Sequence, residues 1–292
     1  MAEHKKTEEI LSTLSKNLKM AEDRAALAEE QSMLCAKMLA DFFCDKEAHA
    51  SAERLYADYL ATLSHPSGKM KALFCRAFAS RNAANAPLQP QAFFGLNETP
   101  AAGSHGKIAY VRNRYNERAF ENFSEAVRSA KPFFVSDFSD ACEAVYNGQC
   151  SYCILPVENT ENGRLFGFYA MLDRYDLKIC ALTAIDGDDS FEAVRLALVG
   201  RTALRVPANP PLYALEFCLT RENGNRLSEL LESAECFGAI PQKIDFLPLE
   251  YDQRVYRIFF TFALPFSEAS AFGLYLSLEY PNYNSVGFYP IP

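Results

Sequence analysis

Leu155-Pro156-Val157-Glu158-Asn159-Thr160-Glu161-Asn162-Gly163 is the stretch that decides the fold. It includes the end of a short apolar run, residues 151–156, that is typical of a buried parallel strand. A carboxylate, an amide and a hydroxyl follow, and Gly163 closes the turn. Ligands of open α/β sheets bind just past the carboxyl ends of strands. We therefore expect Glu158, Asn159 and Thr160 to form a ligand-binding loop, and the alternative is an ordinary α/β loop with incidental polar residues.

The residues around this loop continue an α/β pattern. Residues 138–145 place apolar side chains at the spacing of one helix face, and Asn147-Gly148 supplies a helix stop. Residues 107–111 and 133–135 are expected strands, and residues 115–130 an expected helix between them. The middle of the chain is therefore predicted to be an α/β unit.

Composition limits the kinds of function. The chain has 292 residues, which suggests two or three domains, and 49% hydrophobic and 23% charged residues, which is ordinary for a soluble globular protein. A formal net charge of -8 argues against nucleic acid or an anionic membrane as partner. The sequence shows neither a membrane-spanning run nor a signal peptide, so we expect a cytoplasmic protein.

Cysteine and histidine usage argues against metal or nucleophile chemistry. The nine cysteines are an odd number, which favours a reducing compartment over a disulfide framework. Cys150-Ser-Tyr-Cys153 is the one CxxC, and no second Cys or His pair stands at zinc spacing, so a structural pair of thiols is favoured over a metal or redox site. The four histidines lie in expected helix ends or linkers. We expect no metal and no cofactor.

The first part of the chain is helical. Residues 8–44 are predicted to form one long helix with a heptad seam, which suggests packing against other helices or a partner chain. Residues 50–63 and 69–83 are two further expected helices. Residues 84–106 contain several prolines and glycines without any period, and residues 93–106 are taken as a linker. The seam consists of Leu11, Leu14, Leu18, Ala21, Ala25, Ala28, Ser32, Cys35, Leu39 and Phe42.

From residue 202 onward the pattern is strand, helix, strand, strand, helix, strand. The expected strands are residues 213–220, 242–249, 254–264 and 285–290, and the expected helices are residues 225–237 and 267–279. This βαββαβ order is that of a ferredoxin-like domain.

The central stretch resembles prephenate dehydratase, whose signature is Pro-Ile-Glu-Asn-Ser, two residues and Gly, after a helix that ends in a Val-x-x-Gly turn. Pro156, Glu158, Asn159 and Gly163 match that signature in register, with Thr160 in place of the serine. The resemblance implies a periplasmic-binding-protein-like fold, with the next strand at residues 176–179.

The resemblance also shows what this chain lacks. Val194-Arg195-Leu196 stands where the family has Thr-Arg-Phe, and the family's threonine is central to catalysis. Valine can neither donate nor accept a proton. Residues 107–201 are long enough for one lobe and not for a cleft between two, so dehydratase chemistry is not expected. Glu158, Asn159, Thr160 and Arg195 stay candidates for binding a ligand.

The helical region weakly resembles an all-helical chorismate mutase, the domain that precedes the dehydratase in bifunctional enzymes. Ala72-Leu73-Phe74-Cys75-Arg76 looks like that fold's third helix. That chemistry needs several cations for the two carboxylates of chorismate. By this resemblance the candidates for a residual mutase site are Arg24, Lys37, Glu53 and Arg54.

The C-terminal region is similar to the ACT regulatory domain that senses phenylalanine in the same enzymes. Gly224-Asn-Arg-Leu227 and Val286-Gly-Phe-Tyr-Pro290 stand at two of its landmarks. An amino-acid ligand needs charged partners for its ammonium and carboxylate. Gly224, Arg226 and Asp245 are the candidates for that role, and the alternative is a structural ACT-like domain that pairs two chains.

Together these segments predict a multidomain α+β and α/β protein: helical module 1–92, linker 93–106, single α/β lobe 107–201 and ACT-like domain 202–292. Three functions remain open. The preferred one is a catalytically degenerate relative that binds an aromatic amino acid or a pathway acid as a homodimer or higher oligomer. The others are a residual chorismate mutase or active bifunctional enzyme, and a purely structural oligomerisation protein.

Overall fold

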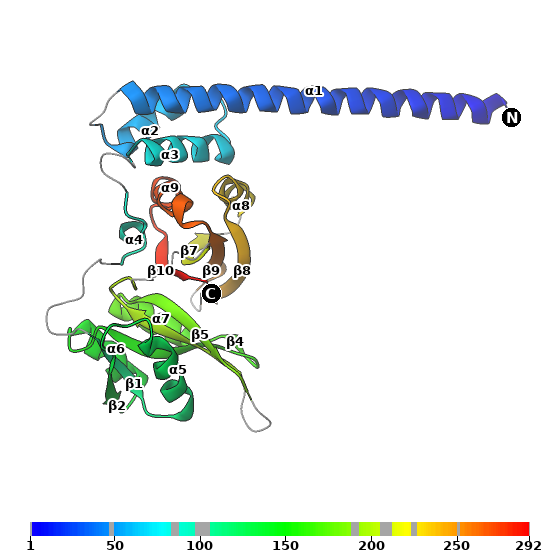
Figure 1. The fold of residues 1–292 in the computed structure, drawn as a ribbon. Helices are drawn as coiled ribbons and strands as arrows, with labels where there is room; N and C mark the ends of the chain where they lie inside the picture. Colours follow the sequence, from blue (N-terminus) through cyan, green and yellow to red (C-terminus); the bar gives the residue numbers. More distant parts are fainter. Residues whose placement is uncertain are drawn as a thin grey trace.

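The computed structural model describes residues 2–46, 50–82, 88–96, 106–187, 193–204, 212–222, 227–249 and 252–291. Three layers are stacked in it (Figure 1): a helical module, a ferredoxin-like domain and an α/β lobe. The result is a mixed α/β protein with N-terminal helices.

The helical module consists of α1 (Ala2–Lys46), α2 (Ala52–Ala61) and α3 (Gly68–Asn82). Helix α1 lies alongside α2 and α3 only near its C-terminal end and extends well beyond them on the other side (Figure 1). Among the side chains of α1 that the structure describes, those of Ala36, Ala40 and Cys44 are buried, and Leu39 packs partly against the same core. The predicted long helix is present, and its N-terminal part projects beyond α2 and α3 (Figure 1).

The heptad seam predicted for α1 does not stay on one face. Leu39 is packed, whereas Phe42 is 57% exposed and Cys44 is buried in its stead. The buried residues Ala36, Ala40 and Cys44 follow an i, i+4 spacing, so the face of α1 that packs on the module lies beside the predicted seam. Leu14 and Leu18, in the projecting part, are 59% and 61% exposed.

The α/β lobe has a five-stranded sheet in the order β2-β1-β3-β6-β5. Strands β1, β2 and β3 are parallel, and β6 runs antiparallel between β3 and β5. The elements are β1 (Lys107–Val111), α5 (Arg114–Ser124), β2 (Lys131–Val135), α6 (Phe138–Tyr146), β3 (Tyr152–Asn159), β4 (Gly163–Arg164), α7 (Phe166–Tyr175), β5 (Lys178–Ile185) and β6 (Val194–Gly200).

Strand β3 is longer than the sequence predicts. Glu158 pairs with Arg195 and Asn159 with Val194 of β6, and both residues also pair with the short strand β4. Glu158 and Asn159 are therefore strand residues rather than loop residues, because β4 and β6 supply backbone partners on both sides. The turn begins at Thr160, and Gly163 adopts a φ of 65° that favours glycine.

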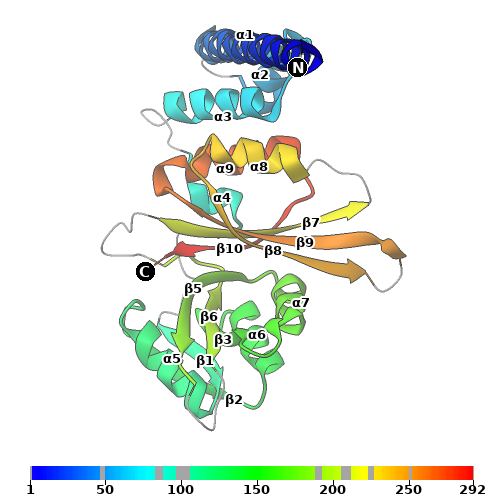
Figure 2. The same cartoon turned by 90° about the vertical axis from the view of Figure 1, so that its right-hand side faces the viewer.

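The C-terminal part is a ferredoxin-like βαββαβ domain, as predicted. Its strands lie in the order β10-β7-β9-β8, with the two helices on one face (Figure 2). The elements are β7 (Tyr213–Glu222), α8 (Leu227–Glu235), β8 (Ile240–Leu249), β9 (Asp252–Leu264), α9 (Phe266–Glu279) and β10 (Asn284–Pro290).

The lobe and the ferredoxin-like domain share one continuous sheet. Strand β10 pairs in parallel with β5 through Gly287 and Ile179. A Cβ atom at Gly287 would lie 2.7 Å from the Cβ of Ile179, which is closer than side chains can approach. Glycine at this position therefore permits the two sheets to join.

Helix α3 lies over the two helices of the ferredoxin-like domain (Figure 2). Lys71 of α3 is buried between the two, with its Nζ 2.8 Å from Glu229 of α8 and 2.6 Å from Glu279 of α9. Burial alone would lower the pKa of Lys71, but its bonds to the two carboxylates raise it. Gly68 allows the close approach, because a Cβ atom there would lie 2.2 Å from Ser233 Oγ.

Part of the segment expected to be a linker is packed against the protein. Residues 88–96 contain the short helix α4 (Pro90–Phe93), and Phe94 and Leu96 after it are buried. Phe94 contacts Phe288 at a ring-centroid distance of 4.8 Å, and its carbonyl accepts a hydrogen bond from Ser285. This segment is therefore packed against β10.

Among the described residues, no helix is both long and apolar enough to cross a membrane. The same residues hold no group of three or more His, Cys, Asp or Glu side chains that could hold a metal ion. All nine cysteines are free thiols, and Cys150 and Cys153 are both buried.

Candidate functional site

A pocket of about 230 Å³ lies at the carboxyl ends of β1 and β3. We call it the strand-end pocket. It occupies the position at which open α/β sheets bind ligands. Among the described residues that line it, none is charged; they are Asn113, Tyr115, Asn116, Phe138, Pro156, Asn159, Leu165, Val194 and Leu196.

The three amides of this pocket are already engaged by the protein. The Oδ1 of Asn113, the N-cap of α5, accepts a bond from the backbone of Asn116 at 2.9 Å, and Asn116 donates its side-chain amide to Val111 O at 2.8 Å. Asn159 Oδ1 accepts from the backbone of Asn162 at 2.7 Å. Asn159 therefore holds its own turn through Oδ1, and the recorded bonds of Asn113 and Asn159 do not use their amide nitrogens, which can donate to a ligand.

Glu158 does not line the strand-end pocket. A bulge in the pairing of β3 with β6 falls between Pro156 and Glu158, so that Pro156 and Asn159 both line the pocket and Glu158 points elsewhere. Its carboxylate bonds to Lys243 at 2.8 Å and to Arg195 at 3.3 Å. Its partial burial would raise the pKa of Glu158, but Lys243 and Arg195 hold it below its usual value.

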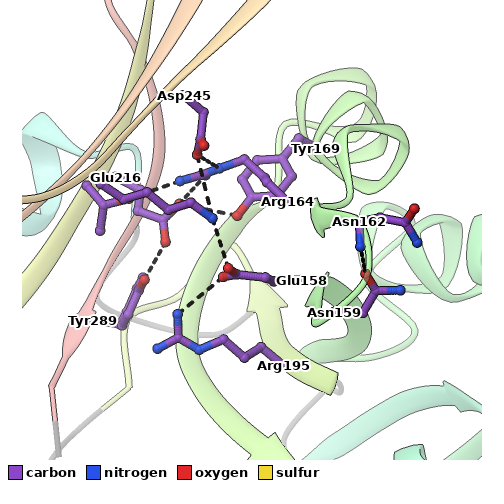
Figure 3. A network of polar contacts seen from close by, with 11 residues as sticks. Glu158, Asn159, Asn162, Arg164, Tyr169, Arg195, Glu216, Asp245 and Tyr289 are labelled. Carbon is purple, nitrogen blue, oxygen red and sulfur yellow. Dashed lines mark hydrogen bonds and ion pairs between the residues drawn. The ribbon is translucent and has the colours of Figure 1, made fainter. Parts of the chain in front are cut away.

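Arg164 of β4 lies at the centre of a buried cluster between the lobe and the ferredoxin-like domain (Figure 3). Its side chain is 4% exposed and that of Glu216 is 5% exposed. Arg164 donates to Glu216 at 2.8 Å, to Asp245 at 2.7 Å and to Thr261 Oγ1 at 3.0 Å. Burial would lower the pKa of Arg164, but the Glu216 carboxylate raises it.

Aromatic side chains enclose this cluster. The Arg164 guanidinium lies 4.6 Å from the ring centroid of Tyr169 and 5.5 Å from that of Phe259. The hydroxyls of Tyr169 and Tyr289 both donate to Glu216, and burial next to that carboxylate raises the pKa of both tyrosines. We call the full set the charge network: Glu158, Arg164, Tyr169, Arg195, Glu216, Lys243, Asp245, Thr261 and Tyr289.

The predicted ligand-binding residues are brought together in part. Glu158, Arg195 and Asp245 all belong to the charge network, with Lys243 between Glu158 and Asp245 (2.8 and 3.8 Å). These side chains form ion pairs with one another. Asp245, which was expected to bind the ammonium group of a ligand, is already paired with Arg164. Thr160 is exposed, and its backbone amide donates to Ala193 O at 3.3 Å. Gly224 and Arg226 lie outside the described residues.

The four mutase candidates are spread over the helical module. Arg24 and Lys37 are exposed on α1 and stand about 20 Å apart along its axis, given a rise of 1.5 Å per residue. Glu53 and Arg54 are exposed in the first turn of α2. The four candidates are thus divided between α1 and the first turn of α2.

Sequence reasoning did not identify Arg164, Tyr169, Glu216, Lys243 or Tyr289. Glu216 carried a detectable signal, because it interrupts the apolar run Tyr213-Ala-Leu-Glu-Phe-Cys218. A carboxylate in a strand with both faces covered must be paired or hydrogen-bonded. Its partner could not be found in the same way, since Arg164 lies 52 residues away in a two-residue strand.

The fold and the pocket define an α/β protein with a strand-end ligand position and an attached ferredoxin-like domain. Residues 111–186 match the family model of prephenate dehydratase. This segment, from the end of β1 to just past β5, is prephenate dehydratase-like and is less than half of the chain. A search of curated protein sequences finds no match.

Solved structures share the fold at low identity. A prephenate dehydratase from Streptococcus mutans is 18% identical with a TM-score of 0.51, over 63% of this chain and 97% of that chain. GqqA, described as a novel type of quorum quenching acylase, is 18% identical with a TM-score of 0.50, over 64% and 95%. A prephenate dehydratase from Arthrobacter aurescens in complex with L-Phe scores 0.48 at 12% identity, over 63% and 90%. The first two similarities concern the fold alone, and the third is too weak to add to them.

Replacing Glu158 tests its pairing with Lys243 and Arg195. Because the folded-state pKa of Glu158 is lowered, its contribution to stability is present above the unfolded-state pKa and is lost as pH falls through the folded-state pKa. Glu158→Gln should therefore lower the melting temperature at pH 7, and the gap to the wild type should close below about pH 4. Glu161→Gln, at an exposed residue of the turn that follows β3, serves as the control. Equal melting temperatures at pH 7 for Glu158→Gln and the wild type would contradict this pairing.

Proposed function

We propose that this chain is a prephenate dehydratase-like protein of aromatic amino acid metabolism that has lost dehydratase chemistry and acts in the cytosol as a small-molecule-binding or regulatory oligomer. The observation that carries this proposal is the lining of the strand-end pocket, which among the described residues contains no charged side chain. Prephenate bears two carboxylates and needs cations or several donors to hold them. The described lining offers three amides and one phenol but no cation, and its amides are partly engaged by the protein, so it would hold two carboxylates weakly.

Proton transfer also lacks a donor in that pocket. Val194 lines it at the position where the family resemblance places a catalytic threonine. Glu158, the carboxylate next to the pocket residue Asn159, is ion-paired outside the pocket. A general acid must reach the group it protonates, at about 2.6–3.2 Å or through one water. These arrangements favour binding over turnover.

The ACT-like domain is proposed to be the regulatory part. Its β8 and β9 contribute Lys243, Asp245 and Thr261 to the charge network, which ends on β3 of the lobe. A ligand that altered the domain would therefore act on the strand that borders the pocket. In this proposal the network is the physical connection between the two parts.

Turnover assays test the loss of chemistry. The purified full-length protein should form no phenylpyruvate from prephenate and should not consume chorismate, both followed by absorbance. An aromatic amino acid or a pathway acid should raise its melting temperature, because a ligand that binds only the folded state stabilises it. Phenylpyruvate formation above the blank would contradict the proposal. Chorismate loss that disappears in Arg24→Ala would instead establish the residual mutase.

Helix α1 supports the proposal of a homo-oligomer. Large apolar side chains are exposed along its length, including Leu14, Leu18, Leu27 and Leu34, each between 55% and 61% exposed. A helix with apolar side chains on exposed faces gains most from packing against another helix. The same feature is what a purely structural oligomerisation protein would show, and ligand binding separates the two.

Two substitutions on α1 test this oligomer. Leu14→Glu with Leu18→Glu should halve the molar mass of a dimer measured by light scattering, since the two exposed residues share one face of α1 and both would place charge in a helix interface. Deleting residues 1–44 is a poorer test, because Ala36 and Ala40 belong to the core of the module. Ser15→Glu with Ala26→Glu adds the same charge at exposed positions and should leave the mass unchanged. A wild type that is already monomeric would refute the oligomer.

A further inference from the structure

A second and larger hollow lies between the helical module and the ferredoxin-like domain. It has a volume of about 660 Å³ and is bordered by α1, α3, residues 88–90 and the first turns of α9. We call it the helix hollow. Its size falls within the range of sites for small metabolites, about 300–1,000 Å³. None of its lining residues belongs to the strand-end pocket or the charge network.

The ionisable residues that line the helix hollow are Lys37, Asp41, Arg76 and Glu268. Arg76 and Glu268 satisfy one another through two parallel hydrogen bonds of 3.1 Å each. Lys37 and Asp41 stand one turn apart on α1, and neither has a recorded hydrogen bond or ion pair with any residue that the structure describes. Both residues are exposed to solvent, so one positive and one negative group at the border of the hollow are within reach of a ligand.

The start of α9 adds donors to the same hollow. Its N-cap is Pro265, which provides no side-chain acceptor for the first-turn amides, and Phe266 and Ser267 line the hollow. First-turn amides without a cap favour a negatively charged group. Together with Lys37 they provide a place for a carboxylate.

The apolar part of the wall includes Leu73 of α3, Leu88 and Phe266, and the polar residues Ser80, Gln89 and Ser270 line the hollow as well. We propose that the helix hollow binds the zwitterion of an amino acid with a large apolar side chain. The carboxylate is held by Lys37 and the first turn of α9, the ammonium by Asp41, and the side chain by the apolar wall. This inference rests on the proposed small-molecule-binding function and adds the ligand class and the place of binding.

The position of the helix hollow gives binding a structural consequence. A ligand there contacts α1 and α3 on one side and α9 on the other, so it bridges two parts of the chain that Lys71 already joins through Glu229 and Glu279. Occupancy therefore stabilises the junction between the helical module and the ferredoxin-like domain.

The test uses the full-length protein with L-phenylalanine as the probe, measured by thermal shift and calorimetry. L-Phenylalanine should raise the melting temperature, and Lys37→Gln and Asp41→Asn should each weaken its binding at least tenfold. Lys19→Gln and Asp23→Asn, at exposed positions of the projecting part of α1, should leave binding unchanged. 3-Phenylpropanoate lacks the ammonium and phenethylamine lacks the carboxylate, and each should bind at least tenfold more weakly than L-phenylalanine.

The outcomes separate this inference from the function on which it rests. Binding of L-phenylalanine that survives both Lys37→Gln and Asp41→Asn would overturn the site and leave the proposed function standing. So would a shift produced by phenylpyruvate and not by L-phenylalanine, and so would 3-phenylpropanoate binding as tightly as the amino acid. No shift with any aromatic amino acid or pathway acid would overturn both.

Discussion

The rest of the structure depends on the buried ion pair between Arg164 and Glu216. Both side chains are almost completely excluded from water, and each charge is compensated only by the other members of the charge network. A charge in such a place is strongly destabilising without its partner. The pair joins β4 of the lobe to β7 of the ferredoxin-like domain, so the two parts cannot separate without exposing it. The shared sheet at β5 and β10 reinforces the same junction.

The same junction holds the carboxylate of Glu158 away from the strand-end pocket. Glu158 is ion-paired to Lys243 on β8, and the bulge after Pro156 leaves the pocket with amides and apolar side chains. On the other face of the ferredoxin-like domain, Lys71 of the helical module forms buried ion pairs with Glu229 and Glu279. The ferredoxin-like domain is thus the middle layer, joined by buried charges to a neighbour on each side (Figure 2).

Local patterns predicted most of the elements. The βαββαβ order, the helix at residues 138–145 and the long first helix follow from periodicity, and Glu158, Arg195 and Asp245 were singled out and do lie in one network. Periodicity could not predict that these charges bind each other, because their partners lie 37 to 85 residues away in the sequence. The sequence pattern placed the end of strand β3 at Pro156, which is too early. Pairing with β4 and β6 extends the strand to Asn159, and that pairing depends on the tertiary structure. Helix α7 was not identified, although its Tyr169 closes over Arg164.

Chemical unfolding of Arg164→Met, alone and combined with Glu216→Gln, tests the central claim most directly. The single variant leaves a carboxylate buried without its cation, and the free energy of unfolding should fall by about 3–5 kcal/mol. The second substitution should restore part of that loss by removing the unpaired charge. Arg195→Met, at a side chain that is 55% exposed, should cost less than about 1 kcal/mol. Equal costs for Arg164→Met and Arg195→Met would show that the buried pair does not hold the two parts together.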